Sequence, residues 1–96
     1  MARAGKVDIP PNTITELTNA DVAGKITFQN LSSSVATVVG TDTATAPAVA
    51  DFDGGLVVPF FDGPAGLTLE DIFPGAGYTR LWVYSRGGGV FAVYHA

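Results

Sequence analysis

The sequence has no cysteine, little charge and no long apolar run. Without cysteine, disulfide bonds, thiol chemistry and cysteine-ligated zinc are excluded, so the chain must be held together by packing or by packing plus subunit contacts. Five basic residues against nine acidic ones give a net charge of −4. This balance argues against a nucleic-acid partner, because such binders carry basic patches. The longest apolar stretches, such as residues 55–61, are far too short to cross a bilayer, so we expect no membrane partner.

Histidine occurs once, as His95 beside the C-terminus. General-base catalysis needs a nucleophile and an orienting partner held around such a residue, and no local motif supplies them. We therefore interpret His95 as a structural residue that closes the last strand. We expect neither enzymatic activity nor a cofactor.

Three aspartates, Asp51, Asp53 and Asp62, lie close enough in sequence to suggest a calcium loop. Residues 51–55 offer oxygen donors and glycine, but the rest of the EF-hand loop pattern, including its closing glutamate, is missing. A solvated acidic turn is the simpler interpretation, so we predict no metal site and keep a cation at these aspartates as the alternative. The glycine run at residues 87–89 lacks the lysine and helix of a phosphate loop, and it is typical of a turn that needs positive φ.

Strand patterns dominate what is present, and 47% hydrophobic residues are enough for a packed core. The clearest pattern spans residues 80–96, where two runs rich in β-branched and aromatic residues flank the glycines. It predicts a β-hairpin. Leu81 and Val83 alternate with Trp82, so both faces carry apolar groups and each needs a covering layer. We interpret Trp82 and Phe61 as core residues, and an exposed aromatic platform for sugars is the alternative.

Residues 25–30 alternate cleanly and predict a half-buried antiparallel strand. Its inward residues Ile26 and Phe28 should pack against Leu81 and Val83 across the core. Shorter strands are expected at residues 13–18, 35–39, 56–58 and 66–70, with a surface loop at residues 41–50 and, as an alternative to the fourth strand, a helical turn over residues 68–73 that Thr68 caps. About seven short strands predict an all-β fold, in which residues 13–96 form one small antiparallel β-sandwich or barrel of the jelly-roll or Ig-like kind.

Residues 1–12 contain Gly5, Pro10 and Pro11 and show no period, so they predict an extended arm ahead of the domain. The arm carries basic residues, whereas residues 41–71 hold acidic residues and no lysine or arginine. This separation suits an arm and a body that meet different neighbouring surfaces, although ordinary solubility explains it as well. The candidate contacts with a partner or a sister subunit are Arg3, Lys6, Val7, Ile9 and Pro10. A loose terminus is the alternative.

Five short segments between Ile26 and Ala96 follow one another in a recognisable order. They are residues 26–32 (Ile-Thr-Phe-Gln-Asn-Leu-Ser), 40–47 (Gly-Thr-Asp-Thr-Ala-Thr-Ala-Pro), 54–56 (Gly-Gly-Leu), 69–75 (Leu-Glu-Asp-Ile-Phe-Pro-Gly) and 93–96 (Val-Tyr-His-Ala). None is a catalytic motif. As an ordered set, they resemble a family of small virion structural proteins of tailed bacteriophages. The N-terminal arm is the part that this resemblance covers least.

The resemblance implies a non-enzymatic structural protein of the phage particle, of the capsid decoration or cement kind. Its implied partner is the major capsid protein, between whose subunits it would bind on the capsid surface of the virion after synthesis in the host cytoplasm. It also implies a homo-oligomer, and a trimer would match the three-fold positions that such lattices offer. The alternatives are a tail or fibre component and a host-carbohydrate-binding module. A small hydrolytic enzyme is disfavoured by the lone histidine.

Overall fold

The computed structural model describes residues 3–95, so residues 1 and 2 of the expected arm and residue 96 lie outside the described residues. The described residues contain eight strands and almost no helix, which confirms the all-β prediction with one strand more than expected. The strands are β1 (Arg3–Ile9), β2 (Thr15–Glu16), β3 (Lys25–Asn30), β4 (Ala36–Thr41), β5 (Leu56–Val58), β6 (Leu67–Thr68), β7 (Arg80–Tyr84) and β8 (Gly89–His95). The helical elements are the 3-10 turn η1 (Val49–Phe52) and α1 (Leu69–Ile72). No helix among the described residues is long and apolar enough to cross a membrane.

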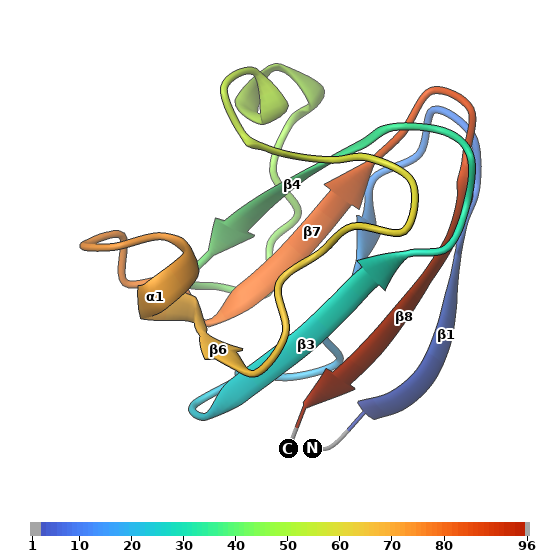
Figure 1. Cartoon of the computed structure of the whole chain (residues 1–96). Helices are drawn as coiled ribbons and strands as arrows, with labels where there is room; N and C mark the ends of the chain where they lie inside the picture. Colours follow the sequence, from blue (N-terminus) through green and yellow to red (C-terminus); the bar gives the residue numbers. More distant parts are fainter. Residues whose placement is uncertain (1–2, 96) are drawn as a thin grey trace.

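The strands form two four-stranded antiparallel sheets that lie in two layers (Figure 1). Sheet A has the order β1-β8-β3-β6, and sheet B has the order β2-β7-β4-β5. Ile26 and Phe28 of sheet A share one buried cluster with Leu81 and Val83 of sheet B, as the sequence predicted. The main core therefore lies between the sheets, where apolar area is removed from water on both inner faces.

A second, smaller cluster covers the outer face of sheet B. Trp82 and Val39 are neighbours on this face, because they are paired in the β4–β7 register. Phe52 of η1 packs over them, which leaves Trp82 only 7% exposed. The interpretation of Trp82 as a buried residue is confirmed. Phe61 was predicted to be a core residue as well, and this is wrong, because its side chain is 59% exposed.

The predicted C-terminal hairpin is also wrong in its pairing. The two strands form as expected, but β7 lies in sheet B and β8 in sheet A, so the glycine run carries the chain from one layer to the other. A Cβ at Gly88 would lie 2.7 Å from the carbonyl oxygen of Ile9, and one at Gly89 would overlap the hydroxyl of Ser32. The crossing brings each strand between two partners, β7 between β2 and β4 and β8 between β1 and β3. In a hairpin, β7 and β8 would pair with each other instead, and each would then have room for only one of these partners.

The expected N-terminal arm is corrected to a strand of the domain. Arg3–Ile9 is extended, but it pairs along its whole length with β8, from Arg3 opposite His95 to Ile9 opposite Gly89. Val7 and Ile9, two of the candidate contacts, belong to the main core, where their side chains are buried. These two residues alternate with Lys6 and Asp8, a strand pattern that the prolines after it obscured.

The segment before α1 combines both sequence alternatives. Residues 67 and 68 form β6, and Thr68 then caps α1 as predicted. The Thr68 hydroxyl accepts a hydrogen bond from the Asp71 N–H, and the Asp71 carboxylate accepts one from the Thr68 N–H. These bonds lower the pKa of Asp71, the backbone N–H of Thr68 being the larger cause. The reciprocal bonds satisfy the first backbone donors of this short helix.

Candidate functional site

Two hollows adjoin β5, one before its N-terminal end and one along its length. The acidic hollow, of about 500 Å³, is lined by residues 39–41 of β4, by Pro47, Asp51 and residues 53–55, and by Phe73 and Tyr78. The apolar groove, of about 310 Å³, is lined by residues 56–58 of β5 and by Asp62, Gly63, Pro64 and Leu67. Residues 55 and 56 are neighbours in the chain, so the two hollows lie next to each other along β5.

Glycines shape the acidic hollow. Gly54 has a φ of 81°, a conformation that side chains disfavour. A Cβ at Gly55 would lie 2.7 Å from the Cγ1 of Val39, so only glycine lets the chain approach β4 this closely. At Gly40, a Cβ would overlap the ring of Tyr78, which lies directly on the β4 backbone. The glycines thus bring the acidic turn after η1 and the Tyr78 ring to the same stretch of β4.

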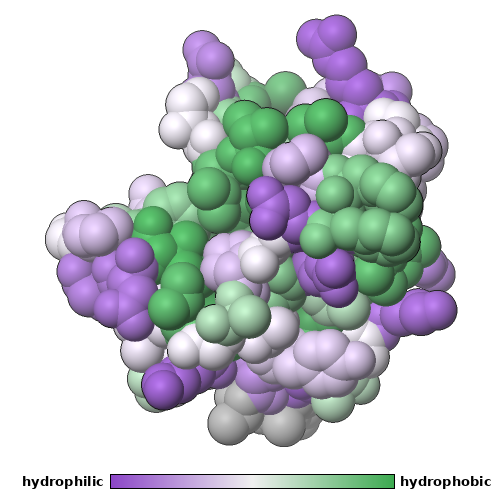
Figure 2. Space-filling model, in the orientation of Figure 1, coloured by the Kyte–Doolittle hydropathy of each residue, from purple (hydrophilic) through white to green (hydrophobic). Residues whose placement is uncertain are grey.

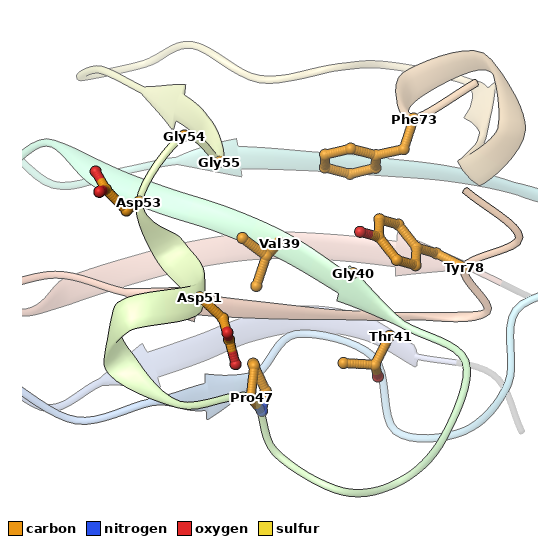
Figure 3. A pocket seen from close by; sticks show the side chains of 10 residues that line it. All are labelled: Val39, Gly40, Thr41, Pro47, Asp51, Asp53, Gly54, Gly55, Phe73 and Tyr78. Carbon is orange, nitrogen blue, oxygen red and sulfur yellow. The ribbon is translucent and has the colours of Figure 1, made fainter. Parts of the chain in front are cut away.

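The walls of the acidic hollow differ in chemistry (Figure 3). On one side, the Phe73 and Tyr78 rings pack edge to face, with centroids 5.3 Å apart and an interplanar angle of 71°. The Tyr78 hydroxyl points toward the side of Val39. On the other side lie Asp51 and Asp53, both exposed. Asp51 Oδ2 accepts a hydrogen bond of 2.8 Å from the Ala48 N–H, which fixes this carboxylate beside the hollow.

The apolar groove is surrounded by exposed hydrophobic side chains. Val57 is 60% exposed, Phe60 50%, Phe61 59% and Leu67 39%, and these four form what we call the apolar patch. The Phe60 and Phe61 rings stack with centroids 3.8 Å apart. Figure 2 shows hydrophobic residues gathered on the face that the segment between β5 and β6 crosses. Large apolar side chains clustered in water are characteristic of interaction surfaces.

Backbone hydrogen bonds to β3 hold the segment that bears the apolar patch. The Phe61 N–H donates to the Asn30 carbonyl at 2.7 Å, and the Asn30 N–H donates to the Asp62 carbonyl at 3.0 Å. The Phe28 N–H donates to the Pro64 carbonyl at 3.0 Å. Gly63 sits against β3 so closely that a Cβ would overlap the carbonyl oxygen of Phe28. The segment thus follows the edge of β3 almost as a further strand would.

Asn30, which was not predicted as a site residue, is fully buried and joins this segment to both sheets. Its Nδ2 donates to the carbonyls of Ser34 at 2.7 Å and Val58 at 3.0 Å. Its Oδ1 accepts from the N–H of Ser32 at 2.9 Å and from the Ser32 hydroxyl at 2.6 Å. The sequence pattern could have indicated this, because Asn30 follows Ile26 and Phe28 at the same alternating, inward-facing positions of the strand. A buried side-chain amide with four hydrogen bonds indicates a structural role.

A network of charged residues lies outside the two hollows. Arg80 Nη1 is 3.0 Å from Glu16 Oε2, and Arg80 Nε is 3.1 Å from Asp21 Oδ1. Hydrogen bonds from the Thr79 hydroxyl and then from Arg80 lower the pKa of Asp21. The bond to Glu16, more than that to Asp21, raises the pKa of Arg80. Because Glu16 lies on β2 and Arg80 on β7, the network ties these paired strands together.

The sequence-predicted site residues are scattered. Asp51 and Asp53 line the acidic hollow, whereas Asp62 lines the apolar groove. Among residues 3–95, no three histidine, aspartate or glutamate side chains come together in a way that could hold a metal ion. The remaining candidate contacts lie on and just after β1, where Arg3 is half-buried and Lys6 and Pro10 are exposed. β1 is at the opposite edge of sheet A from β6, so these residues do not join either hollow.

Comparison with known families, characterised proteins and solved structures found no match.

Proposed function

We propose that this protein is a structural component of a tailed-bacteriophage particle. In this role it is a decoration protein without catalytic activity that binds between major capsid subunits on the outside of the head. Two things support the proposal: the ordered segments that resemble this family, and the apolar patch on an otherwise compact domain. The patch is the observation that carries it.

The apolar patch has the chemistry of a surface that is covered in an assembly. Phe60 and Phe61 each expose about half of their surface, and covering large aromatic rings is among the main sources of energy in protein interfaces. Binding that occurs only on the assembled lattice stabilises that lattice by mass action. Many copies on one shell would add up to a large resistance against heat and internal pressure.

The proposal is tested by co-sedimentation with capsids assembled without this protein. Replacing both Phe60 and Phe61 by serine should weaken binding at least about tenfold, as expected for the loss of aromatic anchors. Tyr94→Ser is the matched control, because Tyr94 is an exposed aromatic residue on the outer face of sheet A. Equal occupancy of the double variant and the wild type would refute the apolar patch as the capsid-binding surface. Failure of the wild type to bind any head would refute the decoration role.

The second proposal from the same resemblance is a position in the tail or in a fibre of the particle. A map of the intact particle distinguishes it from a station on the head, because the chain is then located directly. The proposal also includes a homo-oligomer, with a trimer matching the three-fold positions of a head lattice. Sedimentation equilibrium of the purified chain measures this number, and a monomer at all concentrations would contradict it.

A further inference from the structure

The outer edge of β5 is the feature from which this inference starts. β5 is the last strand of sheet B, and beyond its pairing with β4 no described strand joins it. An open edge presents N–H and C=O groups that can hydrogen-bond to an added strand. The Val58 carbonyl already accepts a hydrogen bond from Asn30 Nδ2, so an added strand would pair beside Leu56 and Val57. Natural edges are protected by shortness, charged residues or prolines; β5 is short, with three residues, but all of them, Leu56, Val57 and Val58, are apolar. Pro59 follows only after the strand has ended.

Both hollows adjoin β5. The acidic hollow extends along Gly54 and Gly55, directly before β5. The apolar groove runs along β5 itself and across to Pro64 and Leu67. A strand added to β5 would thus meet carboxylates at one end and apolar side chains at the other. In peptide recognition by strand addition, the backbone supplies affinity and such pockets supply specificity.

The charge of this surface indicates which kind of segment would bind to the β5 edge. Asp51 and Asp53 lie at one end of β5 and Asp62 lies at the other, and residues 41–71 contain no lysine or arginine. Antiparallel pairing of two β5 edges would place the Asp53 end of one copy beside the Asp62 end of the second copy. That contact sets like charges together, so a second copy is disfavoured at this edge. A segment with a positive charge is favoured.

We propose that the β5 edge binds an extended segment of another protein, which places an arginine or lysine side chain in the acidic hollow and an apolar side chain in the apolar groove. In the acidic hollow, the cation lies between the turn that carries Asp51 and Asp53 and the rings of Phe73 and Tyr78. Carboxylates pair with such groups through charge-assisted hydrogen bonds, and aromatic faces attract them. The inference is independent of the virion assignment, because any protein with such a segment could supply it.

Two synthetic peptides test the inference. Both are acetylated and amidated, alternate valine with threonine, and carry one arginine, near the C-terminus in the first and near the N-terminus in the second. The two orders cover antiparallel and parallel addition to β5. In ¹⁵N-labelled full-length protein, one of them should shift the amide signals of residues 53–58 and 62–67. Replacing its arginine by glutamine should weaken the Kd about tenfold, as for the loss of a charged hydrogen bond.

Protein variants complete the test. The double variant Asp51→Asn with Asp53→Asn should weaken binding of the arginine peptide about tenfold and leave the glutamine peptide unchanged. Asparagine at position 51 can still accept the hydrogen bond from Ala48, so the turn is retained. Asp8→Asn is the control, because it removes one charge from β1 at the far edge of sheet A. Equal affinity for the arginine and glutamine peptides, an unaffected double variant, shifts centred on β1, or no shift at millimolar peptide would each overturn the inference. None of these results bears on capsid binding by Phe60 and Phe61.

Discussion

Replacement of Trp82 by alanine tests whether the outer face of sheet B is packed as described. Trp82 is 7% exposed and lies between Val39 and Phe52. A tryptophan buries up to about 250 Å², and at about 25 cal/mol per Å² this corresponds to an upper limit of about 6 kcal/mol. Its Nε1 also donates to the Thr41 hydroxyl oxygen at 2.8 Å, which adds about 1 kcal/mol. Partial collapse of the cavity offsets some of this, so we expect Trp82→Ala to lower the free energy of unfolding by about 3–5 kcal/mol.

Urea denaturation followed by far-ultraviolet circular dichroism measures this loss, because Trp82 is the one tryptophan in the chain and fluorescence would disappear with it. Trp82→Phe separates the two contributions, since it keeps an aromatic ring and removes the indole donor. The Thr41 hydroxyl still donates to the Thr43 carbonyl in that variant, so we expect a smaller loss of about 1–2 kcal/mol. As a control, Val57→Thr at an exposed position should change stability by less than about 0.5 kcal/mol. A loss below about 1 kcal/mol for Trp82→Ala would show that η1 does not cover this face.

Three further predictions concern β1, the charge network and the segment that bears the apolar patch. Ile9→Ala should cost about 2–5 kcal/mol in urea denaturation, because Ile9 is a core residue; a neutral result would return β1 to the status of a peripheral arm. The pKa of Asp21 is lowered from its ordinary value of 3.8. As the pH falls, the carboxylate of Asp21 is therefore protonated in the unfolded chain before it is protonated in the folded chain. The stabilisation is present above pH 3.8 and is lost as the pH falls below it. Asp21→Asn should therefore flatten the acid side of a Tm-against-pH profile, and an unchanged profile would contradict this. Gly63→Ala should cost more than about 2 kcal/mol because its Cβ meets the Phe28 carbonyl, whereas Gly66→Ala, with a φ of 66° and open space around it, should cost about 1 kcal/mol; equal costs would argue against the close approach at Gly63.

Local patterns were sufficient for most strands and insufficient for their pairing. The alternation of residues 25–30 and the composition of residues 56–58 predicted β3 and β5 with their observed bounds. The glycine run was correctly predicted to need positive φ, and Gly88 has a φ of 69°. A turn between two strands does not determine whether they pair, however, because a layer crossing uses the same residues. What decides is the availability of β1 and β3 as partners for β8, which is a property of distant residues.

The surface at β5 was even less accessible to sequence analysis. Asp51 and Asp53 were noted as possible cation ligands, but their neighbours across the acidic hollow, Phe73 and Tyr78, come from a segment some twenty residues later in the sequence. The position of Tyr78 depends on Gly40, whose missing side chain makes room for the ring. Phe61 was misassigned for a related reason: aromatic residues in small domains usually fill the core, and here Phe28 and Phe91 already do so.

The apolar patch is held by the same residues that close the core, and this bears on how it could bind. Phe61 has a φ of 59°, an unfavourable conformation for a non-glycine residue, which its hydrogen bond to Asn30 helps to maintain. Asn30 in turn also donates to the Val58 carbonyl at the end of β5. The same buried residue therefore holds Phe61 through its main-chain carbonyl and the end of β5 through its side-chain amide. A surface fixed in this way loses little conformational entropy when a partner covers it, so more of the energy of covering Phe60 and Phe61 remains available as affinity. Asn30→Ala removes the side-chain bond to Val58 and keeps the main-chain carbonyl that accepts from Phe61. It should therefore weaken binding at the β5 edge more than binding at the apolar patch, whereas substitutions of Asp51 or Phe60 should affect only their own half of the surface.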